Sequence, residues 1–413
     1  MTNPTDKTDL NELHLGRRPF LRGLGLTALG GLALASPFGA AFAADAAQAP
    51  EASAEGPFTV TDVEGRTVAF ERRPQKFAVG NYILGFLFVS GGAGLAKVAA
   101  LPQDGWEATR TGEYRVLTQA FPQLKSIPSI GGYHDDILKT ETILSIRPDV
   151  LLINRSQFAA NSAKVAVWEK AGIRTVVLDY HSIKLETHAK STELLGKLLG
   201  REAVAESLIR EYRDALTLVA DRLKDLPDAE KPKVYVECGN MGLAAYGNSY
   251  NKTILWGAIL EAAGARNIAR DMKAPYGALD REFVLASNPD VIVIAGSIWA
   301  GHESDQMRMG LTVKEDEAKA RLAGFASRPL WSRVKAVQEK RVLGVDHGSL
   351  RMMMDYVYTL WLAKELHPSR FEDVDVEKIP GDFYRRYLPE VDPAGTFFTM
   401  SIRTGPGRPL RAR

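Results

Sequence analysis

One pattern occurs twice in this chain and constrains its fold more than any other feature. Residues 141–153 and residues 282–294 both spell Glu-x-x-Leu-x-x-x-Pro-Asp followed by four aliphatic residues. Because proline cannot continue a helix, each copy predicts a short helix that stops before its proline. The aliphatic run predicts a strand that is apolar on both faces, which is typical of a parallel sheet covered by helices. Two copies therefore predict two similar lobes.

Further strand and helix signals surround both copies, and they predict an N-terminal lobe at 57–184 and a C-terminal lobe at 227–391. The expected strands are 77–80, 150–154, 175–179, 233–238, 291–295 and 341–345, and helices are expected at 252–263 and 352–366. Helices that alternate with buried strands predict an α/β fold with right-handed crossovers. We expect two Rossmann-like lobes with parallel-rich sheets and a ligand cleft between them.

Residues 185–226 lie between the lobes and have a helical pattern of apolar residues with no Gly/Ser linker. A continuous helix from residue 202 to residue 226 would be ~37 Å long, about the width of a small domain. We therefore expect one long, rigid connecting helix and little movement of the lobes relative to each other.

The composition is that of an ordinary globular protein and excludes several classes of function. The 413 residues carry 52 basic and 50 acidic side chains, which leaves a net charge of +2. This balance does not indicate a nucleic-acid-binding stripe or a polybasic membrane patch. Cys238 is the only cysteine, so an intrachain disulfide and a cysteine-ligated cluster are both excluded.

The N-terminal segment has the features of an export signal. The pair Arg17-Arg18 precedes Phe20, an apolar run covers residues 24–35, and small residues follow. This order predicts a twin-arginine signal peptide at 1–43 with cleavage near Ala43-Ala44. No cysteine lies there to carry a lipid anchor. We expect an unanchored protein in the periplasm.

Three other segments lack the α/β pattern. We expect residues 44–56 to form a disordered leader. Residues 301–324 are interpreted as a charged insertion in the C-terminal lobe, and residues 392–413 as a loosely ordered basic tail.

Residues 60–68 resemble the entry hairpin of the periplasmic solute-binding proteins for iron siderophores, haem and cobalamin. Residues 120–132, 141–149, 260–269 and 366–368 resemble, in that order, the ferric-chelate branch of this family. The resemblance implies a non-enzymatic, monomeric receptor that clasps a small metal chelate between its lobes. It also implies delivery to an ABC permease in the inner membrane with its ATPase. The bound cargo would be an iron chelate or another metal chelate, with no cofactor of the protein's own.

Ligands of open α/β sheets bind beyond the carboxyl ends of the strands, and this rule selects the candidate ligand-binding residues. They are Asn81, Tyr82, Tyr133, His134, Arg155, Tyr180, His181, Glu237, Tyr246, Asn248, Tyr276, Trp299, His302, His347 and Arg351.

These residue types fit a metal chelate in two ways. Tyrosine and histidine can complete the coordination of a ferric ion, and His134 and His347 are the candidate metal ligands. Arginine can pair with carboxylate or catecholate oxygens of a chelator, and Arg155 stands directly after a buried strand. The resemblance implies that Glu141 and Glu282, at equivalent positions of the repeat, dock on the permease.

Other functions remain open from the sequence. A receptor of the same fold could bind haem, cobalamin, a nickel chelate or a molybdate-type oxyanion. A periplasmic metal sensor, a metal chaperone or a cofactor enzyme is the second alternative. The nucleophile elbow, the dinucleotide-binding glycine motif and the His-Glu-x-x-His motif are all missing from the sequence, so no catalytic residue is predicted.

Overall fold

The structure, a computed structural model, describes residues 56–300 and 305–400. The expected signal peptide, almost all of the leader, His302 and residues 401–413 lie outside this part of the chain. The described residues all belong to one compact unit. No described helix is both long enough and apolar enough to cross a membrane.

The N-terminal lobe contains a parallel sheet of four strands in the order β4-β3-β5-β6. These strands are β3 (Phe77–Val79), β4 (Val98–Ala100), β5 (Val150–Asn154) and β6 (Arg174–Leu178). A hairpin of β1 (Phe58–Thr61) and β2 (Thr67–Phe70) precedes them. The helices of this lobe are α2 (Ile83–Ser90), α3 (Trp106–Thr109), α4 (Thr111–Ala120), α5 (Thr140–Ile146), α6 (Arg155–Ala160) and α7 (Ser162–Lys170).

The C-terminal lobe contains a sheet of five strands in the order β15-β13-β11-β7-β9. They are β7 (Lys233–Cys238), β9 (Arg266–Asn267), β11 (Val291–Gly296), β13 (Val342–Asp346) and β15 (Phe398–Met400). The helices are α10 (Leu255–Ala262), α11 (Arg281–Ser287), α12 (Glu315–Ala326), α13 (Lys335–Gln338), α14 (Tyr356–Leu366) and α15 (Ile379–Tyr387). Two antiparallel pairs complete it, β8 (Asn248–Tyr250) with β10 (Tyr276–Ala278) and β12 (Gly310–Leu311) with β14 (Gly395–Thr396). The predicted α/β fold with parallel-rich sheets is confirmed.

Both copies of the repeat form the predicted helix and strand, α5–β5 and α11–β11. Each helix ends at a left-handed residue directly before the proline, Arg147 (φ 49°) in one copy and Asn288 (φ 43°) in the other. The aspartate of each copy then holds the start of the neighbouring strand. Asp149 accepts hydrogen bonds from the backbone N–H groups just before β3, and Asp290 accepts one from the first residue of β7. The Pro-Asp pair thus ends a helix and fixes strand pairing in both lobes.

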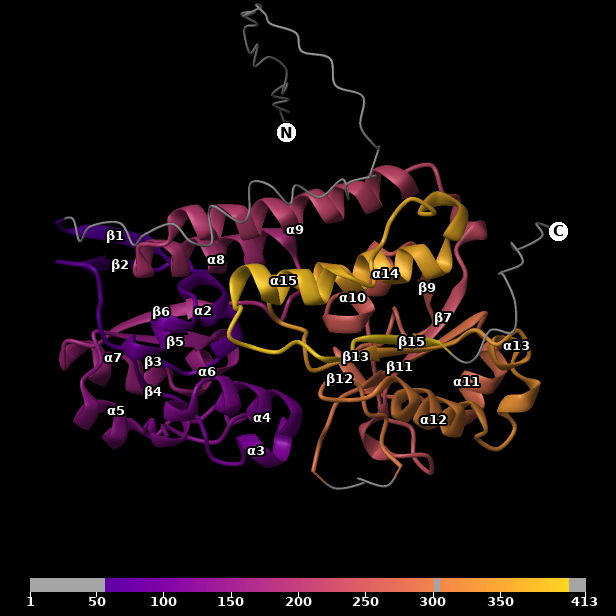
Figure 1. Cartoon of the computed structure of the whole chain (residues 1–413), viewed down its shortest axis with the longest axis horizontal. Coiled ribbons are helices and arrows are strands. Elements are labelled where there is room, and N and C mark those ends of the chain that lie inside the picture. Colours follow the sequence, from indigo (N-terminus) through magenta and orange to yellow (C-terminus); the bar gives the residue numbers. More distant parts are fainter. Residues whose placement is uncertain (1–55, 301–304, 401–413) are drawn as a thin grey trace, which may run out of the picture. The chain divides into compact units, whose positions relative to one another are not determined.

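The segment between the lobes holds two helices, α8 (Leu185–Leu199) and α9 (Glu202–Leu223), separated at Gly200. Gly200 has φ 69°, a left-handed conformation that favours glycine and ends α8. Helix α8 packs on α2 and β6 of the N-terminal lobe, whereas α9 contacts α8 and also α10 and α14 of the C-terminal lobe. Figure 1 shows α9 running along both groups of elements. Helix α9 therefore joins the lobes.

A buried polar cluster adds a second tie between the lobes. Asp355, just before α14, is fully buried and accepts a 2.9 Å hydrogen bond from the hydroxyl of Tyr212 on α9. Its other oxygen lies 3.1 Å from Nε2 of His188 on α8 and accepts a 3.0 Å hydrogen bond from the backbone N–H of Arg351. Three segments distant in sequence therefore meet at one carboxylate.

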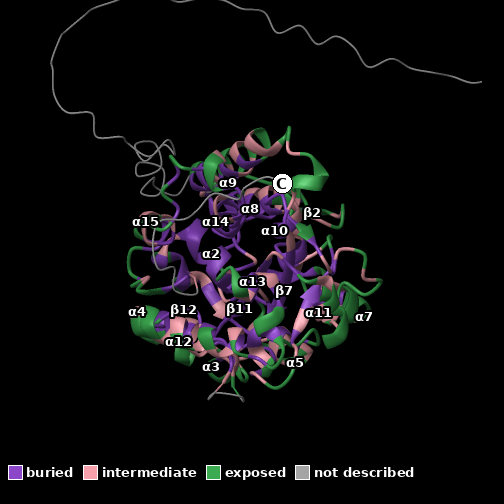
Figure 2. Cartoon of the chain, turned by 90° about the vertical axis from the view of Figure 1, so that its right-hand side faces the viewer, coloured by how far each residue is buried: buried purple, intermediate pink, exposed green. Residues whose placement is uncertain are grey.

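One expectation for the irregular segments is wrong within the described residues. Residues 395–400 form β14 and β15 rather than a loose tail, because Phe398 stacks on Trp361 and β15 pairs with β13. The described part of the predicted insertion contributes to the core, since Met307, Met309 and Leu322 are buried. Figure 2 shows the exposed residues on outer helices such as α7, around a buried interior.

Two helical glycines are expected to respond oppositely to substitution by alanine. A Cβ at Gly257 on α10 would lie 1.8 Å from the carbonyl oxygen of Asn251. Relief of this clash requires a shift of the backbone, which costs free energy. A Cβ at Gly324 on α12 would meet only the flexible end of Leu243 at 3.4 Å. In urea unfolding, we expect Gly257→Ala to lower the unfolding free energy by about 3 kcal/mol. Gly324→Ala is expected to leave it unchanged or raise it by up to ~1 kcal/mol. Equal changes in unfolding free energy for the two variants would contradict the close packing of α10 at Gly257.

Candidate ligand-binding site

The carboxyl ends of the strands of both lobes border one cavity of about 480 Å³. The N-terminal lobe lines it with the segments after β3, β4 and β6, with Arg110 and Glu113 at the start of α4, and with the loop at residues 133–134. The C-terminal lobe lines it with the segments after β7, β11 and β13 and with the pair β8–β10. The cavity thus lies at the edge that the rule for ligand positions indicates in both lobes.

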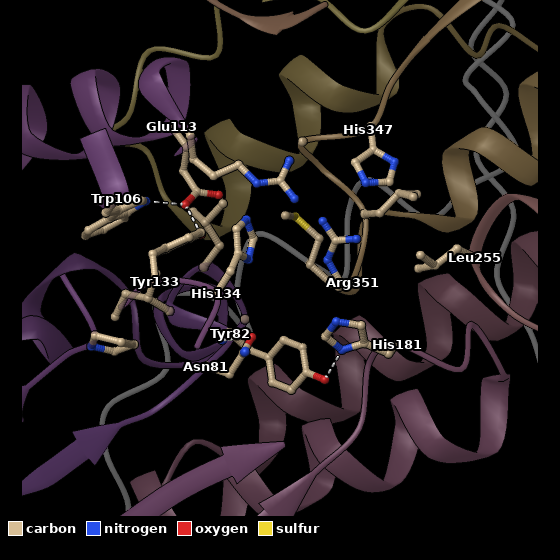
Figure 3. A pocket seen from close by; sticks show the side chains of 18 of the residues that line it. Asn81, Tyr82, Trp106, Glu113, Tyr133, His134, His181, Leu255, His347 and Arg351 are labelled. Atoms are coloured by element: carbon tan, nitrogen blue, oxygen red, sulfur yellow. Dashed lines mark hydrogen bonds between the residues drawn. The ribbon is translucent and has the colours of Figure 1, made fainter. Parts of the chain in front are cut away.

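Most of the residues predicted from the sequence line this cavity. They are Asn81, Tyr82, Tyr133, His134, His181, Asn248, Tyr276, Trp299, His347 and Arg351. Figure 3 shows Glu113, Tyr133 and His134 on one side of the cavity and His347 and Arg351 on the other. Tyr276 is 55% exposed and therefore lies at the rim.

Two arginines give the cavity its charge. Arg110 is 5% exposed, and its Nη1 is buried without a hydrogen-bond partner among the described residues. Burial, with the charge of Arg110 as the next cause, lowers the pKa of Arg351 to about 10. A guanidinium remains protonated at neutral pH even after such a shift. Two cations thus share one cavity.

Three histidines border the same cavity and are neutral at pH 7. Burial is the largest cause in each case, and the charges of Arg110 and Arg351 act in the same direction. The pKa of His134 falls to about 4, that of His181 to about 3, and that of His347 lies well below its usual value of 6.5. No three His, Cys, Asp or Glu side chains in the described part of the chain gather closely enough to hold a metal ion.

An aromatic wall lies on the N-terminal-lobe side. The rings of Trp106 and Tyr133 stack with centroids 5.2 Å apart. Both donate hydrogen bonds to the same oxygen of Glu113, Trp106 at 2.9 Å. Burial raises the pKa of Glu113, while the bond from Tyr133 and the charge of Arg110 oppose that rise. This wall offers a flat apolar surface beside the arginines.

Four of the predicted residues have structural partners instead of lining the cavity. The guanidinium of Arg155 lies 2.7 Å from Glu64 and 3.2 Å from Asp179, so it has a structural role that the sequence did not reveal. Tyr180 is fully buried with its hydroxyl 2.9 Å from that of Thr192. The remaining two belong to a cluster inside the C-terminal lobe. Glu237 pairs with Arg328, and Tyr246 lies under the same guanidinium and accepts a hydrogen bond from Trp331.

Sequence reasoning missed the residues that follow β4. Trp106, Arg110 and Glu113 are spaced by four and three residues, the spacing of one helix face, and this is the signal that could have found them. Strand β4 is only three residues long, so the edge that it supplies was not predicted. Asn240, Tyr250 and Cys238 also line the cavity. Burial raises the pKa of the Cys238 thiol to about 11, which disfavours the reactive thiolate at neutral pH.

The predicted docking residues are exposed. Glu141 and Glu282 occupy the first turns of α5 and α11. A helix that leads directly into a parallel strand runs antiparallel to it, so its first turn lies near the carboxyl edge of the sheet. The two carboxylates therefore lie towards the cavity edge of their own sheets.

Comparison with known proteins agrees with the fold. Residues 94–347 match the family model described as periplasmic binding protein, so the chain belongs to the periplasmic binding protein family. A solved structure described as the TroA-like periplasmic binding protein FepB from Veillonella parvula is 32% identical. That match covers 83% of this chain and 99% of that chain, with a TM-score of 0.77.

More distant relatives belong to the same class. The molybdate-binding protein MolA from Haemophilus influenzae is 22% identical over 286 residues, 64% of this chain and 74% of MolA. A cobalamin-binding protein from Halobacterium salinarum is 29% identical over 166 residues, which are 40% of this chain and 42% of that protein. The chain is a substrate-binding protein of ABC transporters and not an enzyme.

Proposed function

We propose that this protein captures an anionic metal chelate, with a ferric siderophore as the leading candidate, and delivers it to an ABC permease. One observation carries the proposal. Arg110 and Arg351 face the same cavity, and among the described residues no acidic side chain forms a hydrogen bond or ion pair with either guanidinium. Like charges that are held together in a low dielectric favour a ligand of opposite charge.

The other walls of the cavity favour a chelate of substantial size. A volume of about 480 Å³ suits an organic ligand of drug-like dimensions. The stacked Trp106–Tyr133 pair and Trp299 offer apolar surface for the rings or chains of a chelator, while the arginines take its oxygens.

A molybdate-type oxyanion is the second candidate. The same two arginines would pair with its oxygens, and MolA, a relative of this chain, is described as molybdate-binding. An oxyanion of that size would fill only a small part of the cavity, and for this reason we place the chelate first.

We further propose that the cargo reaches the permease through contacts of Glu141 and Glu282. Both are exposed carboxylates, at equivalent positions of the two repeats, towards the cavity edge of their sheets. Such a pair suits a permease with two related halves that carry basic side chains. Residues 1–43 would direct the chain to the periplasm, where the receptor acts as a monomer.

Native mass spectrometry with elemental analysis, on protein isolated from its own periplasm, tests the cargo directly. The expected result is a bound organic mass that contains iron. A bound mass with molybdenum and no organic part would overturn the chelate and support the oxyanion. Protein that carries no ligand and binds neither ferric chelates nor molybdate in titrations would refute both candidates.

A further inference from the structure

His347 follows strand β13 and is fixed in the cavity wall by one hydrogen bond. Its Nδ1 lies 2.9 Å from the indole Nε1 of Trp256 on α10. Trp256 is fully buried and packs edge-on against Tyr358, with ring centroids 5.3 Å apart. Helix α10 itself cannot shift easily, because the Gly257 backbone lies against the carbonyl of Asn251. The indole therefore has one orientation relative to the imidazole.

The chemistry of the indole decides which nitrogen of His347 carries the proton. An indole N–H only donates, so Nδ1 of His347 must accept and cannot carry a hydrogen. The ring is neutral at pH 7, since burial and the nearby arginines hold its pKa well below 6.5. A neutral imidazole with a bare Nδ1 carries its hydrogen on Nε2. No other group among the described residues forms a hydrogen bond with Nε2, which is left to the cavity.

A protonated ring nitrogen donates hydrogen bonds and cannot coordinate a metal, because its lone pair belongs to the aromatic system. We propose that Trp256 fixes His347 as a hydrogen-bond donor to the cargo, an inference that rests on the proposed function. The receptor then recognises an oxygen-rich anionic chelate whose metal is already fully coordinated, and does not supply a ligand to the metal. The expectation that His347 is a metal ligand is replaced by this assignment.

The groups around His347 agree with a surface of donors. Arg110 and Arg351 have only N–H groups to offer. Across the cavity, Nδ1 of His181 lies 2.5 Å from the hydroxyl of Tyr82, and the backbone of Tyr180 also bonds to that hydroxyl. Figure 3 shows the Tyr82–His181 bond. If the Tyr82 hydroxyl donates to Nδ1, then His181 too presents Nε2–H.

The first test uses ligand-free protein and needs no cargo. Nitrogen NMR of protein labelled with ¹⁵N-histidine separates the two ring nitrogens, and the His347 signals are assigned by their loss in His347→Gln. We expect Nε2 of His347 to carry the hydrogen and Nδ1 to be bare. In Trp256→Phe, which keeps a ring but removes the donor, the hydrogen is expected to distribute over both nitrogens. A hydrogen fixed on Nδ1 in the wild type would overturn the proposal.

The second test compares two cargo probes, the ferric complexes of a hexadentate tris-catecholate and of a tetradentate bis-catecholate. We expect the hexadentate complex to bind with its visible spectrum unchanged, and Trp256→Phe to weaken that binding about tenfold. The matched control is Trp361→Phe, since Trp361 is also buried but stacks on Phe398 and, among the described residues, forms no hydrogen bond with His347.

The outcomes separate this inference from the proposed function. Tighter binding of the tetradentate complex, with a spectral change that His347→Gln abolishes, would show metal ligation and overturn the inference while the receptor function stands. If neither complex binds, the ferric-catecholate cargo fails, and the NMR result still decides the role of Trp256.

Discussion

Replacing Arg351 by methionine is expected to weaken binding of an anionic ferric chelate at least 100-fold and, at the same time, to stabilise the empty protein. The affinity falls because truncating one partner of a buried charge pair costs about 2–5 kcal/mol. The stability rises because Arg351 and Arg110 repel each other in the empty cavity, which is one reason why the pKa of Arg351 falls to about 10. Titration calorimetry and thermal unfolding of the same preparation measure both changes.

The matched control for this prediction is Arg155→Met. Arg155 also follows a strand at the carboxyl edge, but it pairs with Glu64 and Asp179 and does not line the cavity. We expect its removal to leave the affinity within about twofold, since it does not touch the cargo. If Arg351→Met left the affinity unchanged, or if both variants weakened binding equally, the electrostatic basis of the proposed function would be wrong.

Arg328→Met is expected to lower the unfolding free energy by about 3–5 kcal/mol, since it leaves a buried carboxylate without its partner. Arg328 forms hydrogen bonds of 2.7 and 2.9 Å with Glu237, which is fully buried. It also donates to the carbonyls of Leu243, Gly242 and Ala245, and so holds the loop between β7 and β8. Urea unfolding of the purified protein measures the loss.

Arg222→Met provides the comparison on the surface. Its guanidinium forms hydrogen bonds of 2.6 and 2.8 Å with Asp373, whose side chain is 65% exposed. Exposed ion pairs of this kind contribute about 1 kcal/mol or less. A loss in Arg328→Met no greater than that in Arg222→Met would contradict the buried pair, whereas partial recovery in Arg328→Met with Glu237→Gln would support it.

The sequence was sufficient for the fold because its strongest signals are local and occur twice. The Pro-Asp pairs at 148–149 and 289–290 end helices and begin strands through short-range sterics and hydrogen bonds, so both helix–strand units, α5–β5 and α11–β11, could be predicted within a residue or two. Strand β15 was not predicted, because it is three residues long and exists only through pairing with β13 and stacking on Trp361.

The candidate site shows the limit of the same reasoning. The strand-end rule gives the edge of a sheet but not the direction of each side chain, so it could not show that Arg155 pairs with Glu64 and Asp179 while Arg351 lines the cavity. Long-range partners such as Glu64 for Arg155 or Arg328 for Glu237 are separated by about ninety residues and leave no local pattern. Arg110 was missed for a different reason. Strand β4, which precedes it, is only three residues long and was not recognised in the sequence.

The position of β15 has a consequence for the order in which the protein is made. Strand β13 lies near residue 345, yet its outer partner is encoded at residues 398–400. A ribosome that has finished the other strands of that sheet has therefore made a lobe with one bare edge, and such edges recruit other chains. The N-terminal lobe can assemble during translation, as early domains generally do. Completion of the second sheet is therefore a late event. The outer edge of β13 stays unpaired until residues 398–400 have been synthesised.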